Sequence, residues 1–282
     1  MKIIECPRDA MQGKDKFIPT SVKAEYLNLL LNTGFDTIDF GSFVSHKAVP
    51  QMKDTAKVLA KLDLSGTQSK LLAIVANLRG AGEASEFDEI HYLGFPLSIS
   101  ETFQLRNTNK TIVEALNTVE EIQNLCTASG KELVVYLSMG FGNPYGDPYN
   151  VDIVQQFSGI LAAIGIHTIS LADTIGVSDT ENITYLFSSL TSEYPGIEFG
   201  AHLHSNPRTA YQKIEAAFDA GCRRFDGAIN GYGGCPFAED VLVGNIATER
   251  IIDLAVQKGD KTGINKTVLA ECLQMAVNVI KP

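Results

Sequence analysis

Short apolar runs alternate along the chain with longer segments in which apolar residues recur at helical spacing. The runs are four to eight residues long, which is typical of buried strands. We predict eight strands, at KIIEC (2–6), TIDF (37–40), KLLAIVA (70–76), EIHYLGF (89–95), ELVVYLS (132–138), TISLAD (168–173), IEFGAHLH (197–204) and RRFDGAI (223–229).

The segments between the runs have the pattern of amphipathic helices. In SVKAEYLNLLLNTG (21–34), for example, Val22, Tyr26, Leu29 and Leu30 recur at helical spacing. Several of these segments end in a glycine that fits a helix C-cap, namely Gly34, Gly130, Gly165 and Gly221.

A strand followed by a helix, eight times over, predicts parallel strands joined by crossover helices. A closed (β/α)8 TIM barrel fits both the number of units and the length of 282 residues. The alternative is an open, doubly wound sheet. Since no long linker divides the chain, we expect one TIM-barrel domain over residues 1–282.

Polar residues gather where the predicted strands end, which is the end of a TIM barrel that carries the chemistry. Such a collection is difficult to explain by packing alone. The residues are Arg8, Asp9, Asp39, Ser42, Asn77, Ser98, Ser100, Glu101, Ser138, Asp173, Thr174, His202, His204 and Asn230.

His202 and His204 are two residues apart in a predicted strand, so both imidazoles face the same way. They could be satisfied core histidines, or they could bind a metal together with the carboxylate of Asp9. Asn245 could add an amide oxygen, or it could be a helix cap. Nitrogen and oxygen ligands without thiolate leave Mg²⁺, Mn²⁺, Zn²⁺, Co²⁺ and Fe²⁺ open, and we expect a catalytic cation.

Arg8 directly precedes Asp9 in the sequence CPRDAMQ. It could form a structural ion pair with Asp39 or Asp173, it could stabilise an oxyanion, or it could do both. Cys235 lies in the glycine-rich segment NGYGGCPFAED (230–240), where a reactive thiol on a loop is a better interpretation than a buried one.

Composition excludes several classes of function. The net charge of −10 argues against a broad nucleic-acid surface, and no run of about 20 apolar residues predicts a membrane span. The first residues lack the layout of a secretory signal, and the five cysteines form no CxxC pair. We therefore expect a cytoplasmic protein with free thiols.

Six segments together resemble the 3-hydroxy-3-methylglutaryl-CoA (HMG-CoA) lyase family, within the metal-dependent superfamily that includes isopropylmalate synthase. Arg-Asp and His-x-His belong to the whole superfamily, whereas the second and fifth segments point to the lyases. In chain order the segments are PRDAMQ, SFVSHKAVPQM, LADTIGV, GAHLHS, GGCPFAED and GNIATE.

The resemblance implies a TIM barrel that cleaves HMG-CoA to acetoacetate and acetyl-CoA with a divalent cation, Mg²⁺ or Mn²⁺. The implied metal ligands are Asp9, His202, His204 and Asn245. The implied catalytic residues are Arg8, which neutralises the enolate, Cys235 on the loop, His202, Asp39 and Asp173. The residues expected to contact an acyl-CoA substrate are Gln12, Ser42, Asn77, Ser138 and Thr174.

Three departures from the family pattern bear on the substrate. Glu5 is one residue closer to Arg8 than usual, so it could face out of the site unless a bulge intervenes. Ser205 follows the second histidine in place of an aspartate. Val134 and Asn143 replace an arginine and a cysteine.

Alternative functions remain open at this point. They are a lyase or aldolase acting on another 3-hydroxyacyl-CoA or on a 4-hydroxy-2-oxo acid, an enzyme of the condensing direction, and a non-catalytic barrel that binds metal or acyl-CoA. Barrels of this family are often dimers, so a homodimer is possible.

Overall fold

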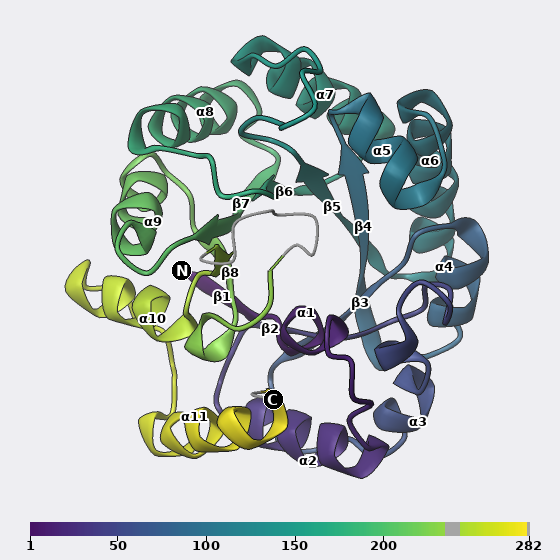
Figure 1. Cartoon of the computed structure of the whole chain (residues 1–282), viewed down its shortest axis with the longest axis vertical. Coiled ribbons are helices and arrows are strands. Elements are labelled where there is room, and N and C mark those ends of the chain that lie inside the picture. Colours follow the sequence, from purple (N-terminus) through teal and green to yellow (C-terminus); the bar gives the residue numbers. More distant parts are fainter. Residues whose placement is uncertain (235–242, 281–282) are drawn as a thin grey trace.

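A computed structural model describes residues 1–234 and 243–280 of the chain. Its centre is a ring of parallel strands that is surrounded by helices (Figure 1). The barrel strands are β1 (Lys2–Glu5), β2 (Thr37–Ser42), β3 (Lys70–Ile74), β4 (Ile90–Ser98), β5 (Glu132–Ser138), β6 (Thr168–Asp173), β7 (Glu198–Ser205) and β8 (Arg224–Gly227).

Every barrel strand pairs in parallel with two neighbours. The strand order β6-β5-β4-β3-β2-β1-β8-β7 is closed by an additional pairing of β6 with β7. The closed (β/α)8 barrel is therefore confirmed, and the open doubly wound sheet is excluded. Strands β5 and β6 have the predicted bounds, while β4 runs on to Ser98, three residues beyond the predicted end.

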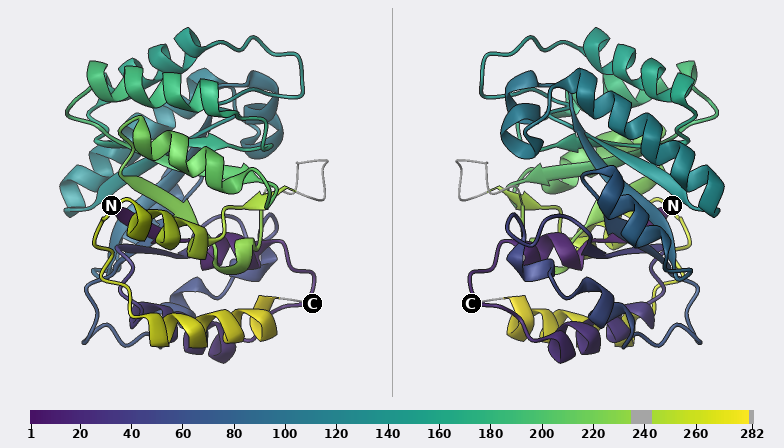
Figure 2. Two further views of the ribbon diagram at one scale, coloured as in Figure 1. Left: turned by 90° about the vertical axis from the view of Figure 1, so that its left-hand side faces the viewer. Right: turned by 90° about the vertical axis from the view of Figure 1, so that its right-hand side faces the viewer.

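Helices connect successive strands and form the outer layer. The described helices are α1 (Pro7–Gln12), α2 (Thr20–Leu31), α3 (Thr55–Leu59), α4 (Leu78–Ser85), α5 (Glu101–Thr108), α6 (Ile112–Ser129), α7 (Val151–Ile164), α8 (Thr180–Glu193), α9 (Ala210–Asp219), α10 (Thr248–Gln257) and α11 (Lys266–Ile280), with short 3₁₀ turns η1 (Pro50–Met52) and η2 (Ile229–Gly231). Helix α11 lies along α2 on the outside of the barrel (Figure 2). None of the described helices is long and apolar enough to cross a membrane.

The predicted glycine caps take left-handed backbone conformations. Gly130 and Gly165 are the C-caps of α6 and α7, with φ of 67° and 90°. Gly34 and Gly221 have φ of 96° and 102° and lie one or two residues beyond the C-caps of α2 and α9. A side chain at these angles would be strained, so glycine lets the chain turn directly into the next strand.

The core has two parts because strand side chains alternate in facing. The larger part fills the space between the barrel and its helices. A smaller apolar cluster of Leu72, Tyr92, Val134 and Tyr136, with Ile74 packed against it, comes from neighbouring strands β3, β4 and β5. Gly94 on β4 faces this cluster, because an added Cβ would lie 2.6 Å from a methyl carbon of Ile74.

One further strand lies outside the barrel pattern. Strand β9 (Gly244–Asn245) runs antiparallel to the end of β7, and its register places Asn245 opposite His204. This pairing brings a residue from near the last helices to the C-terminal end of the barrel.

Candidate active site and metal centre

A cavity of about 620 Å³ opens at the C-terminal ends of the barrel strands. One side of it is polar, and the other is formed by apolar residues of β3 to β5 and the segments beyond them. Its lining is Arg8, Asp9, Gln12, Gly13, Ser42, Val44, Ala48, Val49, Ile74, Ala76, Pro96, Phe103, Arg106, Asn107, Thr108, Tyr136, Ser138, Ala172, Thr174, His202 and His204.

Three potential metal ligands meet on the polar side of the cavity. One ligand atom each from Asp9, His202 and His204 lies within 4.8 Å of the other two. Asp9 is on α1, directly after β1, and the two histidines are on β7. A carboxylate and two imidazoles suit a divalent cation such as Mn²⁺ or Zn²⁺.

The two imidazoles are oriented by acceptors at their Nδ1 atoms. Nδ1 of His202 lies 3.2 Å from Oδ2 of Asp226, and Nδ1 of His204 lies 3.0 Å from the carbonyl oxygen of Thr174. Because a carboxylate and a carbonyl accept, each Nδ1 carries the hydrogen and each Nε2 keeps its lone pair. Among the described residues, buried Nε2 of His204 has no hydrogen-bond partner, as expected of a metal ligand.

Asn245 joins this group through its side-chain amide. Its Nδ2 donates to Oδ2 of Asp9 at 2.6 Å and to the carbonyl oxygen of Tyr232 at 2.9 Å. The four residues that the resemblance assigns to the metal thus come together from three distant parts of the chain. In this arrangement the amide nitrogen, rather than the oxygen, faces the carboxylate.

The charges of the site favour an ionised Asp9. Burial alone would raise the pKa of this carboxyl, but Arg8, His202 and His204 together lower it below its usual range. Burial lowers the pKa of His204, and the neighbouring His202 adds to that effect. Deprotonated carboxylate and neutral imidazole are the forms that bind metal.

Arg8 is held between two carboxylates at the edge of the cavity. Its Nε lies 3.1 and 3.0 Å from the oxygens of Asp39, and its Nη2 donates to the same carboxylate. Its Nη1 donates to Oδ1 of Asp9 at 3.1 Å and to Oε1 of Gln12 at 2.9 Å. Asp39 is thus the ion-pair partner of Arg8, while Asp173 pairs elsewhere. Burial raises the pKa of Asp39 to about 6 although Arg8 opposes the shift.

Four of the five expected substrate contacts line the cavity, namely Gln12, Ser42, Ser138 and Thr174. Asn77 does not. Its side-chain oxygen accepts a hydrogen bond of 2.9 Å from the backbone N–H of Gly80, so it is the N-cap of α4. Because Asn is a common helix N-cap, its position after a strand could not separate this role from substrate binding.

Asp173 also lies behind the cavity wall instead of lining it. Its Oδ2 accepts hydrogen bonds from Nζ of Lys213 at 2.9 Å and from the hydroxyl and backbone N–H of Ser178. Lys213 also donates to the carbonyl oxygens of Gly176 and His204, both at 3.0 Å. Through Lys213, Asp173 therefore links the end of β6 to the end of β7 and supports the backbone of His204.

The first departure from the family pattern turns Glu5 away from the cavity. Its carboxylate accepts a hydrogen bond of 2.9 Å from the backbone N–H of Ile229 and another from the hydroxyl of Thr248. Strand β1 pairs with β2 and β8 without a register shift, so no bulge compensates for the shorter spacing. Burial raises the pKa of Glu5 to about 8.

The other departures also lie outside the cavity lining. Val134 is in the apolar cluster inside the barrel, two residues before Tyr136, which does line the cavity. The Ser205 hydroxyl lies 2.8 Å from the hydroxyl of Thr209 at the start of α9. Oδ1 of Asn143 accepts from the backbone N–H groups of Tyr145 and Asp147, so it organises a turn. Cys235 lies outside the described residues.

Several residues of the site were not predicted from the sequence. Arg106 and Tyr136 line the cavity, and Asp226 contacts a predicted ligand. Arg224 and Asp226 lie two residues apart in the predicted strand RRFDGAI. Two charged residues at this spacing share one face of a strand, which could have indicated polar groups inside the barrel. Arg106 follows β4 on a helix and resembled an ordinary exposed residue.

A family model and a curated relative each match nearly the whole chain. The model of a family described as HMGL-like matches residues 2–276. The cytoplasmic 3-hydroxy-3-methylglutaryl-CoA lyase of Danio rerio is 32% identical over 268 residues, which cover 94% of this chain and 78% of the relative.

Solved structures give the same result. The HMG-CoA lyase of Brucella melitensis superposes with a TM-score of 0.92 at 27% identity, covering 100% of this chain and 99% of the other. An HMG-CoA lyase of Acinetobacter baumannii, solved with coenzyme A and 3-methylmalate, gives a TM-score of 0.90 at 28% identity, with coverage of 99% and 91%. The predicted family is confirmed: this chain belongs to the HMGL-like family.

Proposed function

We propose that this protein cleaves HMG-CoA to acetoacetate and acetyl-CoA with the help of a divalent cation. The observation that carries the proposal is the meeting of Asp9, His202 and His204 in one cavity, with Arg8 beside them. The similarity to named HMG-CoA lyases over most of the chain supports the choice of substrate.

Asp9, His202 and His204 would hold the cation, with Asn245 as a further contact. Two observations fit this role: Nε2 of His204 has no hydrogen-bond partner in residues 1–234 and 243–280, and both Nδ1 atoms have acceptors. When bound, a divalent cation lowers the pKa of a coordinated hydroxyl and polarises a carbonyl. Mg²⁺ and Mn²⁺ are our expected ions.

Arg8 has the position and the donors to stabilise an enolate. Cleavage transfers the proton of the tertiary hydroxyl to a base, forms the ketone carbonyl of acetoacetate as the carbon–carbon bond breaks, and leaves the electron pair on the thioester fragment, which is then protonated on carbon. Asp39, Asp9 and Gln12 engage four of the five N–H hydrogens of Arg8. Among the described residues, the fifth, on Nη2, has no partner, and we assign it to the enolate oxygen.

The contacts of His202 favour a ligand role over a proton-transfer role. Nδ1–H is directed to Asp226, so a ring that held the cation through Nε2 would have no lone pair left to accept a proton. We therefore assign His202 to metal binding. Cys235 remains our expected acid for protonation of the departing carbon.

Acyl-CoA recognition would use the side of the cavity formed by α5. Arg106, Asn107 and Thr108 provide a cation and polar groups there, and Phe103 provides an apolar surface. The Acinetobacter baumannii lyase was solved with coenzyme A, which supports a ligand of this class. We extend the proposal to a cytoplasmic location, as in the name of the Danio rerio relative, and to a homodimer.

The test is to incubate Mn²⁺-loaded protein with HMG-CoA and measure acetoacetate and acetyl-CoA separately. We expect equal amounts of both products, and none from a His204→Ala variant of unchanged fold. Release of coenzyme A without acetoacetate would indicate thioester hydrolysis and contradict the proposal. Cleavage of other 3-hydroxyacyl-CoA thioesters in preference to HMG-CoA would contradict the choice of substrate.

A further inference from the structure

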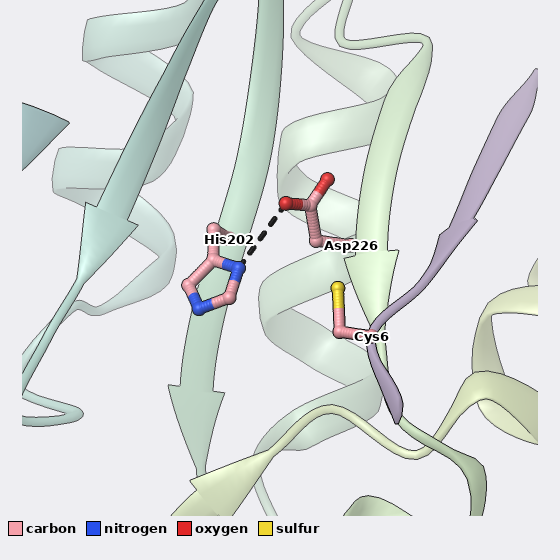
Figure 3. A group of neighbouring side chains, drawn as sticks. All are labelled: Cys6, His202 and Asp226. Atoms are coloured by element: carbon pink, nitrogen blue, oxygen red, sulfur yellow. Dashed lines mark hydrogen bonds and ion pairs between the residues drawn. The ribbon is translucent and has the colours of Figure 1, made fainter. Parts of the chain in front are cut away.

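Directly below the cavity, the barrel interior contains a buried carboxylate that the proposed reaction does not use. Asp226 on β8 is 3% exposed, and its Oδ2 contacts Nδ1 of His202. Among the described residues, its Oδ1 has no hydrogen-bond partner, so this contact is the one that orients the carboxylate. Figure 3 shows Asp226 reaching from β8 to the imidazole on the adjacent strand, with Cys6 beside both.

We propose that Asp226 is a positioning residue that acts through His202, an inference that rests on the proposed metal centre. It selects the tautomer of His202 with hydrogen on Nδ1 and holds the ring so that Nε2 faces Asp9 and His204. A carboxylate behind a metal-binding imidazole also makes the imidazole a stronger ligand.

Strand register fixes this contact. Strands β7 and β8 pair in parallel, with Gly200 opposite Arg224 and Ala201 opposite Phe225. Continuing the register by one residue places His202 opposite Asp226, and both side chains point into the barrel. The same alternation places Arg224, two residues before Asp226, in the interior as well.

Arg224 adds a positive charge to the same part of the barrel interior, and its Nη1 lies 3.6 Å from a carboxylate oxygen of Glu198. Its side chain is fully buried and its guanidinium lies 5.8 Å from the ring centroid of Tyr92, across the barrel. Burial lowers the pKa of Arg224, but Asp226 and neighbouring groups more than reverse this effect. Gly200 leaves room for the long side chain, because an added Cβ would lie 3.0 Å from Cδ of Arg224.

A second metal site would be another interpretation of these residues. One ligand atom each from Cys6, His202 and Asp226 lies within 4.8 Å of the others. Burial raises the pKa of Cys6 well above its usual range, and nearby carboxylates raise it further, so the sulfur is held as a thiol and not as the thiolate that metals prefer. The hydrogen bond between His202 and Asp226 already occupies the other two groups. We therefore favour positioning.

The first experiment measures Mn²⁺ affinity by calorimetry on purified protein. Asp226→Asn should weaken binding about 10- to 100-fold, the usual effect of losing a carboxylate behind a metal ligand. The matched control is Ser170→Ala, which changes another buried side chain near Arg224 that makes no hydrogen bond to His202. It should leave the dissociation constant unchanged.

The second experiment determines the tautomer of His202 in metal-free protein. If Asp226 contributed only to stability, its substitution would leave this tautomer unchanged. The protein has five histidines, so selective ¹⁵N labelling together with a His202→Gln variant, which lacks one set of signals, identifies the His202 ring. At alkaline pH, above the pKa of His202, which burial lowers but Asp226 raises above its usual range, the Nδ1 of His202 should carry the hydrogen in the wild type. Asp226→Asn should shift part of the population to the other tautomer.

The outcomes are distinguishable. Equal Mn²⁺ affinity in wild type and Asp226→Asn, or an unprotonated Nδ1 in the wild type, would overturn the inference whatever the protein catalyses. A variant that melts at lower temperature but binds Mn²⁺ normally would make Asp226 structural and likewise overturn it. Weakened binding in a protein that does not cleave HMG-CoA would support the inference and refute the proposed function. A second equivalent of Mn²⁺ or Zn²⁺, lost in Cys6→Ala, would establish the alternative site.

Discussion

Replacing Arg8 with methionine tests the proposed chemistry without emptying the space that the side chain fills. The substitution removes the contacts to Asp39, Asp9 and Gln12 and the Nη2 hydrogen assigned to the enolate. Oδ1 of Asp9 still accepts a hydrogen bond of 2.8 Å from Nε2 of Gln12, so this proposed metal ligand keeps a contact that orients it. We therefore expect metal content to stay normal.

The expected loss of turnover follows from the loss of one charge-stabilising donor group. Such groups contribute about 10²–10³ in kcat, or about 2.7–4 kcal/mol. Asp39 is 1% exposed and would lose its cationic partner, which in buried ion pairs costs about 3–5 kcal/mol of stability.

This stability loss depends on pH. The folded-state pKa of Asp39 is about 6, above its unfolded value of about 3.9, and it should rise further without Arg8. Folding therefore favours the protonated acid, and the resulting stability is lost as pH rises through the folded pKa. The variant should approach wild-type stability at pH 5 and fall increasingly behind above pH 6.

The assay combines acetoacetate production, metal analysis and urea unfolding at several pH values. Arg8→Lys is the informative companion, because it keeps the charge but loses the planar fork of donors. Arg223→Met, at the opposite end of the barrel, is the control and should retain activity. Turnover of Arg8→Met within about threefold of wild type, at normal metal content, would refute the assigned role, since the smallest expected loss is about a hundredfold.

Two of the three further predictions concern buried charges that support the site, and the third concerns a proposed metal ligand. Lys213→Met should lower the free energy of unfolding by about 3–5 kcal/mol, because it leaves the buried carboxylate of Asp173 without its cation. The control Arg79→Met, which removes an exposed ion pair, should lower it by under about 1 kcal/mol. Equal decreases for the two variants in urea unfolding would contradict the importance of the buried pair. Burial raises the pKa of Glu5 to about 8, so the stability that the protonated acid contributes at low pH is lost as pH rises to 8. The free energy of unfolding of Glu5→Gln should therefore increase relative to that of the wild type between pH 5 and pH 8. A difference that stays constant over this range would exclude the raised pKa. Asp9→Asn should lose one-to-one Mn²⁺ binding in calorimetry, and unchanged binding would remove Asp9 from the ligand set.

The barrel could be predicted from sequence because its signal is repeated. Parallel strands covered on both faces give nearly continuous apolar runs, and each run is followed by a helix that must pack outside. The strand ends were less certain, since a strand such as β4 continues through residues that form no apolar run, up to Ser98.

The site could be predicted only in part. His202, His204 and Asp9 carried a pattern of spacing and position, whereas Asn245 gained its meaning from the family resemblance. Lys213 is on α9, and its reach to the carboxylate of Asp173 depends on the packing of that helix against β7. Tertiary contacts of this kind leave no periodic signal in the sequence.

Crystals soaked in Mn²⁺ and measured at the manganese absorption edge would show whether Asp9, His202 and His204 bind one cation together. We expect one strong anomalous peak at about 2.0–2.3 Å from a carboxylate oxygen of Asp9 and from Nε2 of both His202 and His204. A peak bound elsewhere, or none at saturating Mn²⁺, would contradict the proposed metal centre and the chemistry built on it.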